Sequence, residues 1–215
     1  MTAPNKPEAK LTAARDSGVR SSVAKAIDAA RSVARVFKYL PDRVFHSRRR
    51  TQAVEALAAR APMRSAVFIC HGNVCRSPYA AYLFSRLATR HLATPVAVSS
   101  AGFVGPGRQS PPQALAAAAR RGIDMTAHRS MLVGDAPLAS ADLIVVMNAE
   151  QRESLRQRFA GLRGMILILG DLDPQPVRRR TVVDPWGGSD ALFDESYDRI
   201  DRCIDALVNV LAAKR

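Results

Sequence analysis

The sequence feature that most constrains the fold is a polar loop between an apolar segment and the start of a helix. Residues 66–69 read AVFI, a short apolar run typical of a buried β-strand. They are followed at positions 70–78 by CHGNVCRSP. Ser77 and Pro78 predict a helix start, with Ser77 as N-cap and Pro78 at the first helical position, where its missing N–H has no helical partner to lose. A strand, a tight loop and a helix in this order indicate an α/β fold.

This loop also has the features of a site that holds phosphate. Backbone N–H groups just before a helix point toward one spot, and the helix dipole adds positive potential there. Gly72 and Asn73 suit a tight turn because both tolerate unusual backbone angles. Arg76 offers a planar fork that matches two phosphate oxygens. Cys70 lies at the foot of the loop, where the same donors would stabilise its nucleophilic thiolate, so the loop predicts phosphoryl transfer.

From residue 63 onward, predicted strands alternate with predicted helices. We expect strands over 65–70, 95–100, 141–147 and 164–169, and helices over 78–91, 112–121, 149–159 and 193–213. This alternation predicts a three-layer α/β fold with a central, four-stranded, parallel and twisted sheet. In such sheets, ligands bind at the carboxyl ends of the strands, which is where the polar loop falls.

Residues 1–62 differ from the remainder in charge. They contain 13 Lys+Arg against 5 Asp+Glu, or +8, whereas residues 63–215 contain 19 against 14, or +5. The uneven charge predicts a basic, helical extension over 1–62 and a separate domain over 63–215. Within the extension we expect a disordered start and two helices: 1–16, 17–40 with a stop at Pro41, and about 51–60.

Several placements of this extension are open. It could form a helical hairpin, an amphipathic arm docked on the domain, or an arm on an anionic surface. The favoured placement is a solvated helix whose apolar stripe packs on its own chain or on a second copy, because Ala-rich stripes are weakly hydrophobic. Recruitment to an anionic membrane or an acidic partner through 1–62 is a weaker expectation. No specific nucleic-acid binding is expected, and the sequence leaves the oligomeric state open.

Composition argues against a membrane-spanning or disulfide-stabilised class. No apolar run approaches the ~20 residues of a transmembrane helix, and the N-terminal residues do not show the unbroken apolar segment expected of a secretory signal. The three cysteines, Cys70, Cys75 and Cys203, do not suggest a disulfide framework. Because a thiolate nucleophile suits a reducing compartment, the cytoplasm is the expected location.

The string at 70–78 closely resembles the signature loop of the low-molecular-weight protein tyrosine phosphatases. The resemblance covers about 64–213 and includes SSAG at 99–102 and the segment from Gly122 to His128. It implies a flavodoxin-like sheet and no metal or other cofactor. The implied phosphate-binding loop consists of His71, Gly72, Asn73, Val74, Cys75 and Arg76. The implied polar network that shapes this loop consists of Asn73, Ser77, Ser100 and His128.

The same resemblance implies pocket walls and a redox partner for the nucleophile. The walls would include His71 and Trp186, together with Phe103 or Val104. Cys75 would be the second loop cysteine, able to form a reversible disulfide with Cys70 under oxidation. No functional role is expected for Cys203.

Phosphoryl transfer from an aryl oxygen also needs a carboxylic acid opposite the loop, to protonate the leaving oxygen. Asp184 is the best candidate, because Pro185 stiffens the backbone beside it and Trp186 offers a flat wall for an aromatic ring. The resemblance decides in its favour: family members carry the general acid in a late Asp-Pro followed by an aromatic residue. Asp171 and Asp173 are rivals that lie close to the predicted fourth strand and lack the aromatic neighbour.

The resemblance therefore implies an enzyme that hydrolyses phosphotyrosine through a phosphocysteine on Cys70, with Arg76 and Asp184 as its other catalytic residues. Ala81 replaces a usual Glu, and the tandem tyrosines of animal members do not follow the acid, which favours a bacterial-type enzyme. The implied partner is a tyrosine-phosphorylated protein, for example a bacterial tyrosine kinase.

Three alternative functions are less consistent with the sequence. A protein-arginine phosphatase of the same fold would carry Thr at Val74, whose methyl groups better suit a phenol. An arsenate reductase would need two further cysteines, which 122–165 lacks. A non-catalytic phosphoprotein-binding protein would not need the intact set of Cys70, Arg76 and Asp184.

Overall fold

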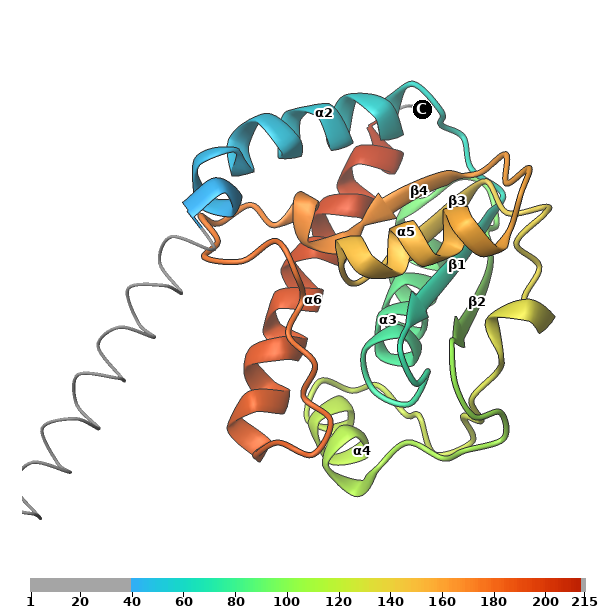
Figure 1. Cartoon of the computed structure of the whole chain (residues 1–215), viewed down its shortest axis with the longest axis vertical. Helices are drawn as coiled ribbons and strands as arrows, with labels where there is room; N and C mark the ends of the chain where they lie inside the picture. The colour runs from blue at the N-terminus through green and yellow to red at the C-terminus, as the bar shows by residue number, and fades with distance from the viewer. Residues whose placement is uncertain (1–39, 214–215) are drawn as a thin grey trace, which may run out of the picture. The chain divides into compact units, whose positions relative to one another are not determined.

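The computed structural model describes residues 40–213 (Figure 1). The chain divides into two units, Met1–Pro41 and Asp42–Arg215, and all the elements below belong to the second. The expected disorder over 1–16 and nearly all of the expected helix over 17–40 lie outside the described residues. Residues 40–44 are helical, so helical conformation continues past Pro41, where the sequence predicted a stop. A proline removes one N–H donor but leaves the residues after it free to adopt helical angles.

A four-stranded parallel sheet forms the centre of the fold and confirms the predicted architecture. Its strands are β1 (Ser65–Cys70), β2 (Ala97–Gly102), β3 (Leu143–Val146) and β4 (Met165–Ile168). The spatial order is β2-β1-β3-β4, and every neighbouring pair is parallel. Strand order reverses direction around β1, so the loop after β1 lies at the switch point where such sheets bind ligands.

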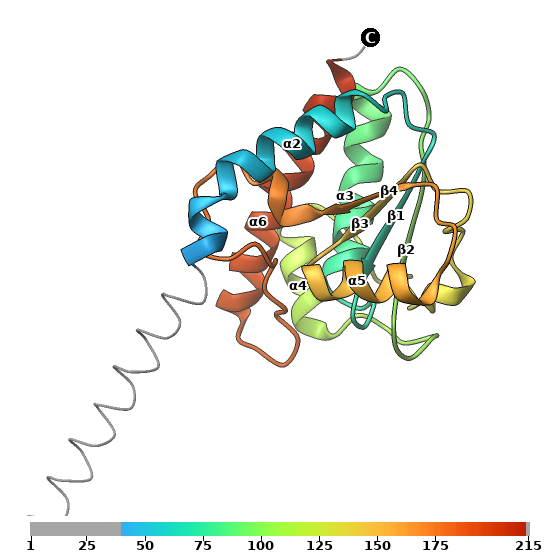
Figure 2. The same ribbon diagram turned by 45° about the horizontal axis from the view of Figure 1, so that its top comes forward.

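Helices cover both faces of the sheet, as Figures 1 and 2 show. They are α2 (His46–Ala58), α3 (Arg76–His91), α4 (Pro112–Ala119), α5 (Ala149–Arg158) and α6 (Asp190–Ala212), with 3₁₀ turns η1 (Val133–Asp135) and η2 (Leu169–Leu172). None of the helices between residues 40 and 213 combines the length and the apolar character needed to span a membrane.

Side chains on the two faces of β1 belong to two different apolar clusters. Phe68 points into the larger cluster, which α2, α3, α4 and α6 share, and its ring centroid lies 5.4 Å from that of Phe84. Ile69 points into the smaller cluster, which includes Leu155 of α5. Because successive strand residues face opposite sides, one run of apolar residues serves both layers. The result is the predicted three-layer arrangement.

The start of α3 differs from the prediction. The helix begins at Arg76 with Cys75 in the N-cap position, and no side chain caps it. Ser77 is therefore not the N-cap but the second helical residue, and Pro78 is the third. The hydroxyl of Ser77 lies 3.0 Å from Cys70 Sγ. The serine that a local pattern assigns to helix capping instead contacts the predicted nucleophile.

The segment before β1 also differs from the prediction. The expected helix over 51–60 is α2, which begins at His46 and takes in the basic run Arg48–Arg50. Its inner face carries Ala53 and Leu57 into the larger cluster, where Leu57 is 0% exposed. α2 thus packs as part of the same unit as the sheet. The predicted boundary between 62 and 63 differs from the division after residue 41.

We expect Leu57→Ala to lower the free energy of unfolding by about 2–5 kcal/mol, the cost of a cavity in a packed core. Urea unfolding followed by circular dichroism measures this change. Gln52→Ala, on the exposed face of the same helix, is the matched control and should change stability by less than about 0.5 kcal/mol. Equal effects of the two substitutions would show that α2 is not part of the core.

Candidate active site

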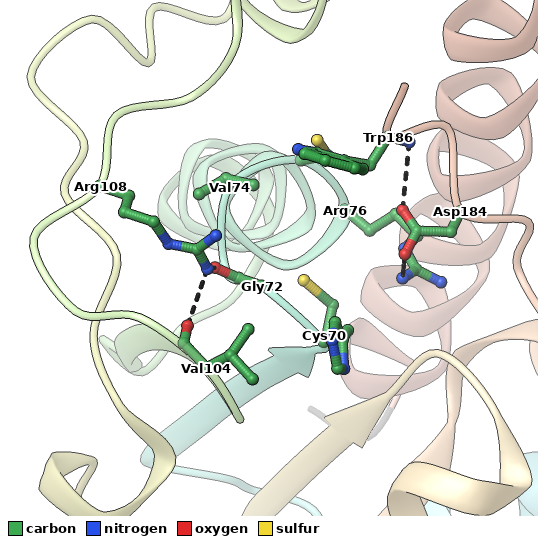
Figure 3. A pocket seen from close by; sticks show the side chains of 10 residues that line it. Cys70, Gly72, Val74, Arg76, Val104, Arg108, Asp184 and Trp186 are labelled. Atoms are coloured by element: carbon green, nitrogen blue, oxygen red, sulfur yellow. Dashed lines mark hydrogen bonds and ion pairs between the residues drawn. The ribbon is translucent and has the colours of Figure 1, made fainter. Parts of the chain in front are cut away.

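The loop between β1 and α3 wraps around the sulfur of Cys70 (Figure 3). Asn73 has a φ of 50°, the left-handed conformation that asparagine tolerates better than most residues. This turn directs the Asn73 backbone N–H at Cys70 Sγ, at 3.2 Å. The Ser77 hydroxyl donates to the same sulfur at 3.0 Å. Two donors therefore converge on one sulfur atom.

The side chain of Asn73 joins the loop to its surroundings. Its amide N–H groups donate to Ser77 Oγ at 3.0 Å and to Ser100 Oγ at 2.8 Å. Its Oδ1 accepts from the backbone N–H of Met131 at 2.8 Å. The carbonyl of Asn73 lies 2.8 Å from His128 Nε2. The structure thus brings together all four side chains of the expected network and adds the backbone of Met131, which no sequence pattern indicated.

The hydrogen bond of His128 identifies its tautomer. A backbone carbonyl can only accept, so Nε2 of His128 carries the proton. The ring is buried and meets Tyr82 edge-on, with centroids 6.3 Å apart. Burial lowers the pKa of His128 below its ordinary value and outweighs the contact with Asn73, which raises it; Arg129 lowers it further. The neutral imidazole is therefore the form that the fold stabilises.

Gly102 lets β2 approach the loop closely. A Cβ atom on this residue would lie 2.7 Å from Asn73 N and 2.8 Å from His71 O, closer than such atoms come in proteins. The next residue, Phe103, donates its N–H to His71 O at 2.8 Å. The SSAG segment therefore contributes a hydroxyl from Ser100 and a backbone that fits against the loop.

Arg76 and Asp184 lie side by side in the pocket and contact each other. Arg76 is 3% exposed, its Nη1 donates to Val182 O at 3.0 Å, and its Nη2 forms an ion pair with Asp184 Oδ2. Nε of Arg76 is buried and has no hydrogen-bond partner in the described part of the chain. Nε and Nη2 form one edge of the guanidinium, which matches two oxygens of a phosphate group. Asp184 Oδ1 accepts from the Trp186 N–H at 3.3 Å.

These residues line a pocket of about 210 Å³. Its lining residues are Cys70, His71, Gly72, Val74, Cys75, Arg76, Val104, Arg108, Asp184 and Trp186. Phe103 and Val104 were the two alternatives expected for the pocket wall, and Val104 is the one that lines the pocket. Phe103 instead packs against the smaller cluster, with Arg158 5.5 Å from its ring centroid. Trp186 is 67% exposed and forms part of the rim.

Arg108 is a pocket residue that sequence reasoning missed. Its Nη2 donates to Gly72 O at 2.8 Å and to Val104 O at 2.7 Å, and its Nε donates to Gly105 O at 3.0 Å (Figure 3). One guanidinium thus ties the pocket wall to the phosphate-binding loop. All three partners are backbone carbonyls, which leave no mark in the sequence, so no local pattern could have identified this arginine.

The rival carboxylates have other partners. Asp171 pairs with Arg180, at 2.7 and 2.5 Å. Asp173 is fully buried between Arg199, at 3.1 Å, and Arg202, at 3.2 Å. Neither carboxylate lines the pocket, so Asp184 is the carboxylate that faces Cys70 and Arg76.

The remaining cysteines are buried thiols. Burial raises the pKa of Cys75, and the nearby Cys70 and Asp184 raise it further. Burial, followed by the charge of Asp173, raises the pKa of Cys203 to about 12. All three cysteines are free in the structure, so the expected Cys70–Cys75 disulfide stays a prediction. Residues 40–213 contain no cluster of side chains able to hold a metal ion.

The lowered pKa of His128 predicts a pH-dependent stability. Below the unfolded-state pKa of 6.5, the unfolded chain takes up a proton that the folded chain resists, so the free energy of unfolding falls as the pH falls. His128→Gln keeps an N–H donor but cannot titrate. Between about pH 7.5 and about pH 5.5, urea unfolding should show a steeper loss of stability for the wild type than for His128→Gln. An equal loss of stability with falling pH in the wild type and in His128→Gln would contradict a lowered pKa of His128 in the folded state.

The whole region that forms the pocket is similar to known proteins. A family model described as "Low molecular weight phosphotyrosine protein phosphatase" matches residues 65–215. The probable low molecular weight protein-tyrosine-phosphatase EpsP of Ralstonia nicotianae is 30% identical over 147 residues, which are 68% of this chain and 94% of EpsP. The protein-arginine-phosphatase of Bacillus subtilis is 29% identical over 150 residues, 69% of this chain and 97% of that protein.

A solved structure shows the same architecture. The structure of Vibrio vulnificus Wzb in complex with benzylphosphonate superposes with a TM-score of 0.60 at 25% identity, covering 68% of this chain and 98% of Wzb. The matched region begins at β1 and contains all of the pocket residues described above. The chain belongs to the low molecular weight phosphotyrosine protein phosphatase family.

Proposed function

We propose that this chain is a protein-tyrosine phosphatase that hydrolyses phosphotyrosine through a phosphocysteine intermediate. The observation that carries the proposal is the arrangement around Cys70. Its sulfur accepts two hydrogen bonds, Arg76 lines the same pocket with its Nε unpartnered in the described part of the chain, and Asp184 pairs with the neighbouring Nη2. Membership of a phosphatase family supports the same reaction.

In the first step, the Cys70 thiolate attacks phosphorus and the bond from phosphorus to the phenolic oxygen breaks. The loop amides and the dipole of α3 stabilise the equatorial oxygens, and Nε and Nη2 of Arg76 bind two of them. Asp184 now pairs with Nη2, so an arriving phosphate replaces the carboxylate there. Asp184, in its protonated form, then donates a proton to the phenolate as it leaves.

In the second step, water attacks the phosphocysteine. Asp184, left as a carboxylate by the first step, accepts a proton from that water, and the sulfur–phosphorus bond breaks. Inorganic phosphate leaves and the thiolate is restored. The hydroxyl of Ser77 donates to the sulfur, which stabilises it as a leaving group.

The pocket walls favour an aromatic leaving group. Val74 presents its methyl groups to the cavity, and the flat ring of Trp186 stands at the rim. Such apolar walls suit the ring of a phosphotyrosine. The Wzb complex with benzylphosphonate supports this choice, because that ligand joins an aromatic ring to a phosphonate.

The proposed partner is a tyrosine-phosphorylated protein, for example a bacterial tyrosine kinase. The cytoplasm is the proposed compartment, because a thiolate nucleophile needs reducing conditions. Recruitment through the basic extension stays a prediction, since most of its residues lie outside the described ones.

We expect Cys70→Ser to reduce hydrolysis of phenyl phosphate by at least about a thousandfold, because it removes the nucleophile. Asp184→Ala should reduce it by about a hundredfold to a thousandfold, the range for a general acid. Steady-state kinetics measures both changes. Urea unfolding curves serve as the control for folding, and undiminished turnover in either variant would contradict the proposed mechanism.

A second prediction separates phosphotyrosine from phosphoarginine. Wild-type kcat/KM should be higher for a phosphotyrosine peptide than for the matching phosphoarginine peptide, because Val74 offers no hydrogen bond to a guanidinium. Val74→Thr adds a hydroxyl of similar volume and should shift the ratio toward phosphoarginine by about tenfold, the effect of about one hydrogen bond. A wild-type preference for phosphoarginine would favour the activity named for the Bacillus subtilis relative.

A further inference from the structure

The segment 42–58, which we call the brace, lies outside the family match yet contacts the part of the chain that leads to Asp184. That part, residues 171–184, is called the acid loop here. The brace includes α2, and its start lies beside the acid loop in both Figure 1 and Figure 2.

Three polar contacts join the brace to the acid loop. Asp42 Oδ2 accepts from the backbone N–H of Arg180 at 2.9 Å. His46 Nε2 lies 3.0 Å from Asp173 O in a buried hydrogen bond, so His46 is the donor. Arg49 Nε lies 3.6 Å from Asp171 Oδ1, the distance of an ion pair.

The brace contacts the acid loop at the place where the start of the loop lies against Arg180. A Cβ on Gly170 would lie 2.0 Å from Arg180 O, so the two backbones touch and only glycine fits. The carboxylate of Asp171 binds the Arg180 guanidinium through both oxygens. Arg49 also donates to Asp42 O at 2.5 Å, which links the brace contacts to one another. The brace therefore fixes the base from which the last four residues of the acid loop extend.

From Arg180 the chain runs directly to the catalytic acid. Thr181 O accepts from Arg199, Val182 N donates to Met147 O at 3.0 Å, and Val182 O accepts from Arg76. Only residues 181–183 separate Arg180 from Asp184, so a displacement of the chain at Arg180 has few residues over which it can be absorbed before Asp184.

We propose that Asp42 and His46 are positioning residues for the acid step of the reaction. The inference rests on the proposed function, because it assumes that Asp184 donates the proton. Loss of either side chain leaves a backbone group of the acid loop without its partner and loosens the loop base. Asp184 then meets the leaving oxygen less often in the productive geometry, while Cys70 and Arg76 stay in place.

The test compares two aryl phosphates in the full-length chain. Phenyl phosphate has a basic leaving group that needs the acid, whereas 2,4-dinitrophenyl phosphate has a leaving group that does not. The ratio of kcat/KM for the dinitrophenyl ester to that for the phenyl ester should rise about fivefold in Asp42→Ala and in His46→Ala. Asp42→Asn, which keeps an acceptor oxygen, should restore the wild-type ratio. Gln52→Ala, on the exposed face of α2, is the matched control.

A double-mutant cycle separates positioning from general destabilisation. In an Asp184→Ala background, Asp42→Ala should no longer change the ratio, because the group that it positions is absent. A fall in kcat/KM that is equal for both esters, an unchanged ratio, or a shift that persists without Asp184 would each overturn the proposal.

Amide hydrogen exchange gives a readout that does not depend on turnover. Asp42→Ala should speed exchange over residues 180–184 by about fivefold or more relative to Gln52→Ala. Unchanged amide exchange over residues 180–184 would overturn the proposal that the brace orders the acid loop, even if the kinetic ratios changed. A wild type that hydrolyses neither ester would instead overturn the proposed function, and the exchange result would still decide whether the brace orders the acid loop.

Discussion

The hydrogen bonds of Asn73 are the interactions on which the rest of the site depends. Its side chain uses both donors and its Oδ1, and its backbone donates to the nucleophile and accepts from His128. Because the residue is fully buried, each partner lost would leave a polar group without water, at a cost of about 1–3 kcal/mol. The left-handed turn of the loop is thus held by contacts from β2, from α3 and from the segment around Met131. The amides that would bind phosphate are oriented before any ligand arrives, which is the condition for electrostatic catalysis.

A second constraint is the sharing of Arg76 between two tasks. One part of the guanidinium holds the carbonyl of Val182, and so orders the chain that carries Asp184. The opposite edge pairs with Asp184 itself and leaves Nε buried without a partner. In the proposed reaction, the same arginine would therefore link the binding of phosphate to the release of the Asp184 carboxylate from its ion pair. Ordering of the acid loop and occupation of the pocket are coupled through one side chain.

The sequence predicted those parts of the site that local chemistry determines. The strand, the loop and the helix after it could be located because the change from apolar to polar residues is sharp at Cys70. The family resemblance then placed Asp184 and His128, which no local pattern could bring to the loop. Arg108 and Met131 escaped detection because their contacts involve backbone atoms of distant segments. For α2, the sequence favoured an apolar stripe that packs on its own chain or on a second copy; because its apolar residues are mostly alanines, only the tertiary structure shows that Leu57 lies in the core of the same chain.

The distribution of the three thiols has a practical consequence. Cys70 and Cys75 both line the pocket, but the raised pKa values of Cys75 and of the buried Cys203 keep these two thiols protonated near neutral pH. Thiol-directed alkylating reagents react with thiolates that they can reach. A folded sample should therefore incorporate one equivalent of such a reagent, and the amount incorporated counts the competent molecules in a preparation without the need for a substrate.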